Sequence, residues 1–428
     1  MTPADNTTPP TTPAAAAPRN RRWRFLPLLA ALGPGIIAAS AGNDAGGIAT
    51  YSQDGASYGY ATLWMIFVMT FSLVIVQEMA ARMGAVTGKG FAALIRERFG
   101  IRPTIFAMMC LLASNAATSV AEFAGIAAAL ELFGISKFVS VPIAALVVWL
   151  LVVRGSYRNV EKMLLVLSGV FFAYVIAAFL AKPDWGVVLR ATVVPTFIPT
   201  SAFVLIVIAT IGTTIAPWMQ FFVQSNIVDR GTTVKELLYT RIDVIGGAIA
   251  ANVVAWFIIV TTGTVLYPRG IVASSAEKAA QALAPVAGHY ASSLFAIGLF
   301  GASLLAAFVL PLTASYAVCE AFGFERGIDR TWAEAPVFNG IYTFVIFFGA
   351  LFVLIPKAPL ISIMVLSQAV NGVLLPFLLI FMMIIINDRR IMGRHVNGRI
   401  YNGLGWTTVV VVIGLTVALL GMTAFGVK

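Results

Sequence analysis

Charged residues are scarce in this sequence. Asp, Glu, Lys and Arg make up 11% of its 428 residues, whereas hydrophobic residues make up 60%. A soluble globular protein of this length needs far more polar surface than these residues supply, so the composition excludes that class. We therefore interpret the chain as an all-α, multi-pass integral membrane protein.

Cysteine and histidine are also rare, with two of each. Cys110 and Cys319 both fall within apolar stretches, so we expect no disulfide framework. His289 and His395 fall in predicted loops, which leaves no imidazole inside the membrane to carry protons near neutral pH. The sequence also lacks a hydrolase-type metal motif and a nucleotide-binding loop. We expect neither an enzyme nor an ATP-driven pump, and no cofactor.

Apolar stretches recur along the chain. A helix needs about 20 apolar residues to cross a bilayer, and eleven stretches meet this requirement. The predicted spans are 27–51, 61–84, 104–133, 138–153, 162–181, 198–226, 241–267, 290–319, 337–356, 358–386 and 405–426. Residues 1–18 are mostly Thr, Pro and Ala, so 1–24 are expected to be a disordered cytoplasmic tail before a membrane domain over 25–428.

The basic residues predict the orientation in the membrane. The net charge is +10, and when alternate loops are assigned to opposite sides, most of the 28 Lys and Arg fall on one side. By the positive-inside rule that side is cytoplasmic. The amino terminus is then inside and the carboxyl terminus outside the cell inner (plasma) membrane. The charge therefore orients the protein in the lipid bilayer, and we expect no nucleic-acid or nucleotide partner.

Two predicted spans carry helix-breaking residues at matching places. The first break, 42–47, contains Asp44, and a carboxylate at this depth costs several kcal/mol unless it faces a cavity or a partner. The second break, 212–218, contains Pro217, which lacks a backbone donor. Breaks five spans apart are typical of two inverted five-helix repeats with a substrate site between them.

Several motifs resemble the Nramp family of divalent-metal transporters. They are Gly33-Pro34-Gly35, Asp44-Ala45-Gly46-Gly47, residues 80–89, Ala121-Glu122, and residues 158–162, 183–185, 366–368 and 388–393. The resemblance implies a LeuT-like fold, with two inverted five-helix repeats at about 25–185 and 196–388 and an eleventh transmembrane helix at about 405–426. It also implies that a divalent cation binds at the two breaks and crosses by alternating access.

Four positions depart from the family pattern. Gly47 replaces the family's metal-binding Asn, and Ala216 replaces a Met that supplies a thioether ligand. Trp218 replaces a histidine linked to proton movement. Ser119 replaces an acidic residue, although Glu122 of the same predicted span remains. These departures remove one soft ligand and two titratable groups.

We expect Asp44 to supply the principal charge at the cation site, with nearby backbone oxygens contributing directly or through water. The expected metal-site residues are Asp44, Ala41, Gly47, Thr213, Ala216 and Gln368. Thioether sulfur disfavours hard cations, whereas carboxylate, carbonyl and water favour Mg²⁺ and Mn²⁺. Magnesium keeps several waters, so the space expected at Gly47 suits a partly hydrated ion. The sequence predicts import of Mg²⁺ with Mn²⁺ as a further substrate, and it does not determine which of the two ions is preferred.

The departures also predict cation flux that is not coupled to protons, because Ser119 and Trp218 do not titrate near neutral pH. One alternative is a proton-coupled Mn²⁺ or Fe²⁺ importer. Transport of Cd²⁺ separates the two, since a soft ion gains little from a site without sulfur. A less favoured alternative is an organic-solute symporter, whose substrate carboxylate Asp44 would repel.

Overall fold

The computed structural model describes residues 42–153, 170, 173–327 and 330–424. All regular secondary structure in these ranges is helical, as expected. The helices are α3 (Ala45–Tyr58), α4 (Leu63–Thr87), α5 (Phe91–Phe99), α6 (Ile101–Glu131), α7 (Lys137–Val153), α9 (Ala173–Ala181), α10 (Trp185–Val193), α11 (Ser201–Thr214), α12 (Pro217–Asp229), α13 (Leu237–Val265), α14 (Ala276–Ala280), α15 (Ala284–Ala287), α16 (Ala291–Phe322), α17 (Pro336–Val353), α18 (Leu360–Ile386), α19 (Arg389–Met392) and α20 (Arg399–Ala424).

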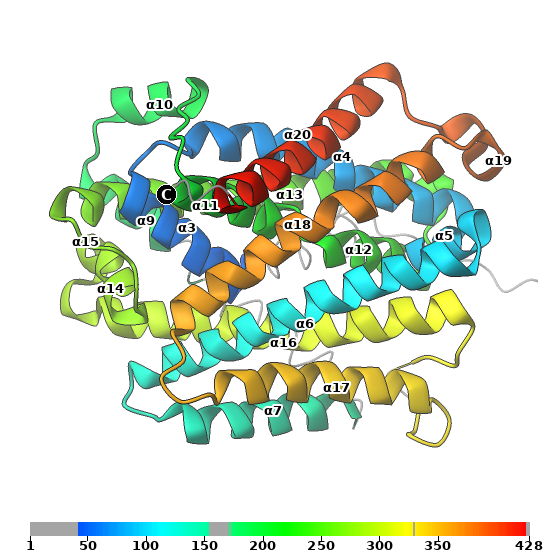
Figure 1. Cartoon of the computed structure of the whole chain (residues 1–428), viewed down its shortest axis with the longest axis horizontal. Helices are drawn as coiled ribbons and strands as arrows, with labels where there is room; N and C mark the ends of the chain where they lie inside the picture. The colour runs from blue at the N-terminus through cyan, green and yellow to red at the C-terminus, as the bar shows by residue number, and fades with distance from the viewer. Residues whose placement is uncertain (1–41, 154–169, 171–172, 328–329, 425–428) are drawn as a thin grey trace, which may run out of the picture.

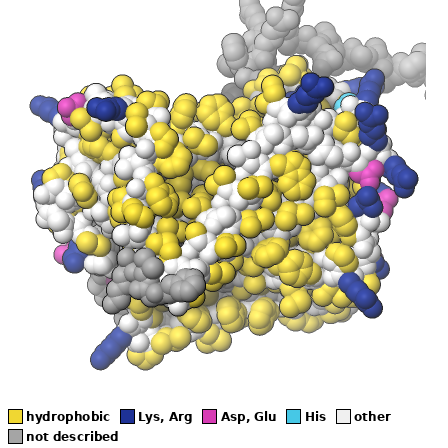
Figure 2. Space-filling model, turned by 45° about the horizontal axis from the view of Figure 1, so that its top comes forward, with side chains coloured by type: hydrophobic (Ala, Val, Ile, Leu, Met, Phe, Trp, Pro, Cys, Tyr) yellow, Lys and Arg dark blue, Asp and Glu magenta, His cyan; other side chains and the backbone are white. Residues whose placement is uncertain are grey.

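The molecule has the surface of a membrane protein. Eight helical stretches in the described ranges are long and apolar enough to cross a bilayer, and α7 is a shorter apolar helix. Figure 2 shows hydrophobic side chains over a broad belt, with most Lys and Arg at the two ends of the molecule. The tail 1–24 and parts of the predicted spans 27–51 and 162–181 lie outside the described residues.

The two half-helices α3 and α11 lie in the interior of the bundle. The long helices α6 and α16 run side by side across the molecule, as do α6 and α18, and α7 and α17 lie along one flank (Figure 1). Helix α3 packs against α11, α13 and α18, and α11 packs against α18. The surrounding long helices therefore hold both half-helices in fixed positions relative to each other.

The first break is shorter than predicted. Asn43 and Asp44 are non-helical, and α3 begins at Ala45. Gly46 and Gly47, which were expected to belong to the break, form the first turn of α3 instead. The reason is that Asp44 caps this helix, with an extended backbone (φ −73°, ψ 180°) and a side chain that accepts from the amide of Gly47.

Helix α3 also continues to Tyr58, beyond the end predicted at residue 51. Ser52 and Asp54 lie beyond the predicted end of this span, and both side chains are completely buried. Polar residues persist inside a membrane protein when they face other helices rather than lipid. Asp54 is therefore a second acidic residue of the first half-helix, outside the predicted span.

The second break lies within the predicted range 212–218 but is also shorter than predicted, because Gly212 to Thr214 belong to α11 and Pro217 and Trp218 to α12. Helix α11 ends at Thr214, and α12 begins at Pro217 after two non-helical residues, Ile215 and Ala216. Proline is suited to the first position of a helix because its missing N–H has no partner there in any case. The sequence Ile-Ala-Pro thus ends one helix and starts the next.

Helices α11 and α18 approach each other closely at two glycines. A Cβ atom on Gly212 would overlap the backbone of Gln368 and Gly372, and one on Gly372 would overlap the carbonyl of Ile208. Only glycine permits this approach. The contact brings Gln368 of α18 to the level of the second break.

Candidate cation site at the helix breaks

Asp44 lies at the amino terminus of α3 and is 2% exposed. Its Oδ1 accepts a hydrogen bond from the amide of Gly47 at 2.7 Å. The positive end of the helix dipole stabilises the carboxylate, while an ionised carboxylate has more acceptor sites than this one bond uses. The Asp44 carboxylate therefore lies at the amino terminus of α3 with acceptor capacity that this one hydrogen bond does not use.

A second carboxylate, from Glu122 of α6, reaches the same helix end. Its Oε2 accepts from the amide of Ala45 at 3.2 Å. Its Oε1 has no hydrogen-bond partner among the described residues, and the side chain is completely buried. Two carboxylates therefore meet at the first turn of α3. Such a pair favours a bound cation or proton, because like charges in a buried site repel each other.

Three oxygens converge on the position of Gly47. A Cβ atom on this residue would lie 2.8 Å from Thr213 Oγ1, 3.2 Å from the carbonyl oxygen of Gly42 and 3.3 Å from Asp44 Oδ1. Thr213 Oγ1 has no hydrogen-bond partner in the described part of the chain. Hydroxyl, carbonyl and carboxylate oxygens are the ligands that hard divalent cations prefer.

This geometry corrects two expectations about the site. The space beside Gly47 is not empty, because the Thr213 hydroxyl, the Gly42 carbonyl and the Asp44 carboxylate surround it. The oxygen that Thr213 presents here is its side-chain hydroxyl and not its backbone carbonyl. The absence of a side chain at Gly47 therefore lets the two broken helices bring their oxygens close together.

Gln368 lies against the first turn of α3, and its amide nitrogen, not its oxygen, is the group without a partner among the described residues. The side chain lies directly against Gly46, where a Cβ atom would overlap it. Its Oε1 accepts from Asn371 Nδ2 at 2.8 Å. Its Nε2 has no partner among the residues described. The free group is therefore a donor, and the oxygen expected to bind the ion is engaged within α18.

The other expected metal-site residues contribute less. Ala41 lies outside the described residues. Ala216 is in the second break with extended backbone (φ −66°, ψ 140°), but its carbonyl accepts from the amide of Met219 at 3.1 Å. Ala216 thus has no side-chain ligand, and its backbone oxygen closes the first turn of α12.

The two replaced positions of the proton path are both buried. Ser119 and Trp218 are completely buried, and neither Ser119 Oγ nor Trp218 Nε1 has a partner within the described ranges. The backbone of Ser119 faces α17, close to Gly349. Of the three positions named for the proton path, only Glu122 is a carboxylate, and it is also the one that contacts α3.

A thioether that the sequence analysis did not consider lies next to the site. Met219, in the first turn of α12, shares a small cavity with Asn43, Tyr51 and Thr213. Its methyl carbon lies 2.5 Å, and its sulfur 3.9 Å, from the position of a Cβ atom on Gly42. In the sequence, Met219 stands three residues after Ala216, and this spacing places both residues on one face of a helix. That spacing is the signal by which the sequence could have indicated Met219 as a neighbour of the site.

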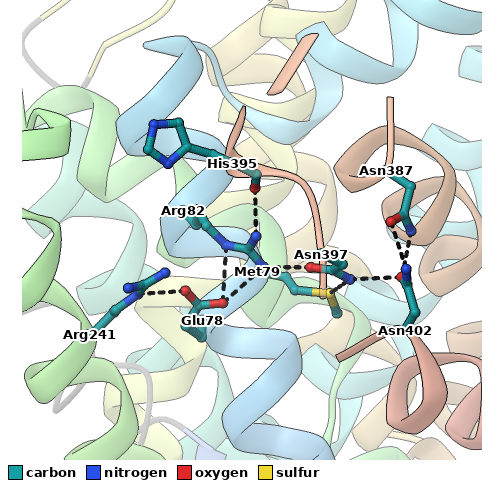
Figure 3. A network of polar contacts seen from close by, with 8 residues as sticks. All are labelled: Glu78, Met79, Arg82, Arg241, Asn387, His395, Asn397 and Asn402. Carbon is teal, nitrogen blue, oxygen red and sulfur yellow. Dashed lines mark hydrogen bonds and ion pairs between the residues drawn. The ribbon is translucent and has the colours of Figure 1, made fainter. Parts of the chain in front are cut away.

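A separate ion network lies in the carboxyl-terminal half of α4. Glu78 of α4 is completely buried and contacts Arg241 of α13 at 2.7 Å and Arg82 at 3.1 Å (Figure 3). Arg82 also donates to the carbonyl of His395 at 2.6 Å and to Asn397. The charge of Glu78 is therefore compensated by two arginines, which gives this buried carboxylate a structural role.

These observations define a class of protein. Two half-helices are broken inside a bundle of membrane-length helices, and carboxylates and free oxygens meet at the breaks, which is the arrangement of secondary transporters with discontinuous helices. Residues 35–421 match the family described as natural resistance-associated macrophage protein-like. The chain therefore belongs to the Nramp family, a family of transporters and not of enzymes, as the sequence motifs predicted.

Relatives match over nearly their whole length. The chain is 28% identical over 402 residues to the divalent metal cation transporter MntH of Aeromonas hydrophila, covering 92% of this chain and 95% of the relative. It is 29% identical over 417 residues to MntH of Deinococcus radiodurans, covering 94% and 90%.

Solved structures confirm the LeuT-like fold. The manganese transporter of Eremococcus coleocola superposes with a TM-score of 0.77 at 22% identity, over 96% of this chain and 89% of that chain. The transporter MhsT, bound to L-phenylalanine, superposes with a TM-score of 0.57 at 14% identity, over 90% and 97%. At these identities the likeness concerns the fold alone.

Proposed function

We propose that this protein carries divalent metal cations across the plasma membrane by alternating access, with Mn²⁺ and Mg²⁺ as substrates. The observation that carries the proposal is that Asp44 Oδ1, the Gly42 carbonyl and the Thr213 hydroxyl, which has no partner among the described residues, all lie beside Gly47 between the two breaks. The three groups are all oxygen ligands, which suits both ions. The names of the MntH relatives support divalent-cation transport in general.

The preference for hard cations rests on the side chains around this point. Ala216 supplies no thioether, and Thr213 and Asp44 supply oxygen. A partly hydrated Mg²⁺ needs one or two carboxylates and retains several waters. Asp44 and Glu122 are the two carboxylates available at the first turn of α3.

We also propose that transport is not coupled to protons. Ser119 and Trp218 stand at the two altered positions and do not titrate near neutral pH. The membrane potential alone contributes about 2.3 kcal/mol per charge per 100 mV, which drives a divalent cation into a negative cytoplasm.

The second candidate is a proton-coupled importer of Mn²⁺. Two observations favour it: Glu122 Oε1 is buried without a partner in the described residues, and the thioether of Met219 lies beside the cavity. Under this alternative Glu122 carries the proton, and sulfur adds affinity for softer ions.

Uptake by proteoliposomes that contain a pH dye tests both candidates. We expect Mg²⁺ and Mn²⁺ to enter without acidification, and Asp44→Asn to lower binding by about 10- to 100-fold because a charged ligand is lost. Asn also caps helices well, so α3 should still form. Asp184→Asn is the matched control, since Asp184 is an exposed cap of α10 with amide contacts at 2.9 and 3.2 Å.

The possible results separate the candidates. Acidification in step with ion entry contradicts uncoupled flux and supports the proton-coupled importer. Normal binding by Asp44→Asn, measured by calorimetry, contradicts the assignment of the site.

A further inference from the structure

The outer halves of the two broken helices meet along a polar seam. On α3 the seam consists of Gly47, Tyr51, Asp54 and Tyr58, whose spacing of four, three and four residues places them on one face. Each residue of this face contacts α11. Gly47 lies near Thr213, and the three others contact Thr214, Thr210 and Phe203.

Asp54 is the charged residue of this seam. It is completely buried. Its Oδ2 accepts from Thr210 Oγ1 at a long distance of 3.5 Å, and its Oδ1 has no hydrogen-bond partner among the described residues. No ion pair within the described ranges includes it. An ionised carboxylate buried in this way costs several kcal/mol, so packing alone does not explain its position.

Its position relative to the site is informative. Asp54 lies seven residues beyond Gly47, which is about 10 Å along the helix axis. It lies on the side of the site away from the basic network of Glu78, Arg82 and Arg241, and that side is external in the predicted orientation. An ion that enters between α3 and α11 from outside therefore meets Asp54 before it meets Asp44.

The groups around Asp54 are oxygens. Tyr58 and Thr62 lie nearby on the chain, and Thr210 faces it from α11. The hydroxyl of Thr62 is buried without a partner in the described part of the chain. One carboxylate with hydroxyls and water is a suitable environment for a hard divalent cation that keeps part of its hydration shell.

We propose that Asp54 is a second divalent-cation site on the external route, occupied in transit when α3 and α11 separate. The seam is closed in this structure, since Tyr51 Oη lies 3.1 Å from Thr214 Oγ1 and the rings of Tyr58 and Phe203 are 5.0 Å apart. Asp54 captures the ion from outside and raises its local concentration near Asp44. This inference rests on the proposed transport of divalent cations and on the predicted orientation.

The test is initial-rate uptake of Mn²⁺ and of Mg²⁺ at varied external concentration, with wild type and Asp54→Asn in oriented proteoliposomes. Loss of the negative charge is expected to raise KM by about tenfold, the order of magnitude of a unit charge acting on a dication at a few ångströms in a wet environment. Vmax should stay within about twofold, because the rest of the cycle is unchanged. Glu131→Gln is the control, since it removes an exposed carboxylate at the same end of the bundle.

Each result is decisive. A raised KM in Asp54→Asn but not in Glu131→Gln supports the site. An unchanged KM, or a reduced Vmax at constant KM, overturns it. If Asp54 served only as a hydrogen-bond acceptor, Asn would keep that role, and if it served only in packing, the capture of the ion would not change. Neither role therefore raises KM. If wild type takes up neither ion, the proposed function itself has failed.

A second variant covers the case in which Asp54→Asn does not fold. Thr210→Val conserves shape and charge but removes the hydroxyl next to Asp54. We expect KM to rise about threefold, the effect of one ordinary hydrogen bond. An unchanged KM in this variant also overturns the proposal.

Discussion

Gly47→Ala tests the geometry of the cation site most directly. The new methyl carbon would lie 2.8 Å from Thr213 Oγ1, 3.2 Å from the Gly42 carbonyl and 3.3 Å from Asp44 Oδ1. It would crowd these three oxygens and displace them from their positions. The substitution removes no ligand and adds no charge, so any loss of binding comes from displacement of the ligands.

The expected magnitude follows from two opposing effects. Alanine in place of glycine in a helix contributes up to about 1 kcal/mol of stability, whereas overpacking costs about 1–3 kcal/mol. The fold should therefore tolerate the change. Loss of one charge-assisted ligand contact costs about 1.5–3 kcal/mol, which is about 10- to 100-fold in Kd.

Calorimetric titration of Mn²⁺ and Mg²⁺ into purified protein measures this loss. Gly186→Ala is the matched control, because Gly186 lies in the first turn of α10 and its Cβ atom would lie 3.2 Å from the capping Asp184 Oδ1. The double variant Gly47→Ala/Thr213→Ala removes the closest contact but keeps the methyl group against the Gly42 carbonyl and Asp44 Oδ1, so it should bind no more tightly than Thr213→Ala alone. Affinity of Gly47→Ala within twofold of wild type would refute the proposed convergence of ligands.

Two further predictions concern Met219 beside the site and Glu78 in the network with Arg82 and Arg241. Met219→Leu removes the thioether, so it should abolish the part of the Cd²⁺ inhibition of Mn²⁺ uptake that depends on sulfur, and it should leave Mg²⁺ uptake unchanged. Undiminished inhibition by Cd²⁺ would show that the thioether does not reach the ion. Glu78→Gln should lower the free energy of unfolding by about 3–5 kcal/mol, because the buried charge that Arg82 and Arg241 contact is removed. The measurement is denaturation in mixed micelles. The control Glu97→Gln breaks an exposed pair with Lys89 and should lower the free energy of unfolding by about 1 kcal/mol or less. Equal effects of Glu78→Gln and Glu97→Gln would contradict a stabilising role of the Glu78 network.

The sequence alone determined the class of protein, the family and the places where two helices break. Apolar length, Gly and Pro are local properties, and they act on the backbone wherever the chain lies. Asp44 was identified for the same reason, since an acid inside an apolar stretch is visible without coordinates. The second break was placed correctly because Pro217 fixes the start of a helix.

Only the tertiary structure decided which atoms meet Asp44. The hydroxyl of Thr213, the carboxylate of Glu122 and the amide of Gln368 come from three other helices, and their rotamers depend on packing that no local pattern encodes. Asp54 is a second residue whose surroundings the sequence does not determine. It lies three residues beyond the predicted end of the first span, whereas burial against α11 keeps it inside the bundle, because a polar residue in a membrane protein is stabilised by the helices it faces.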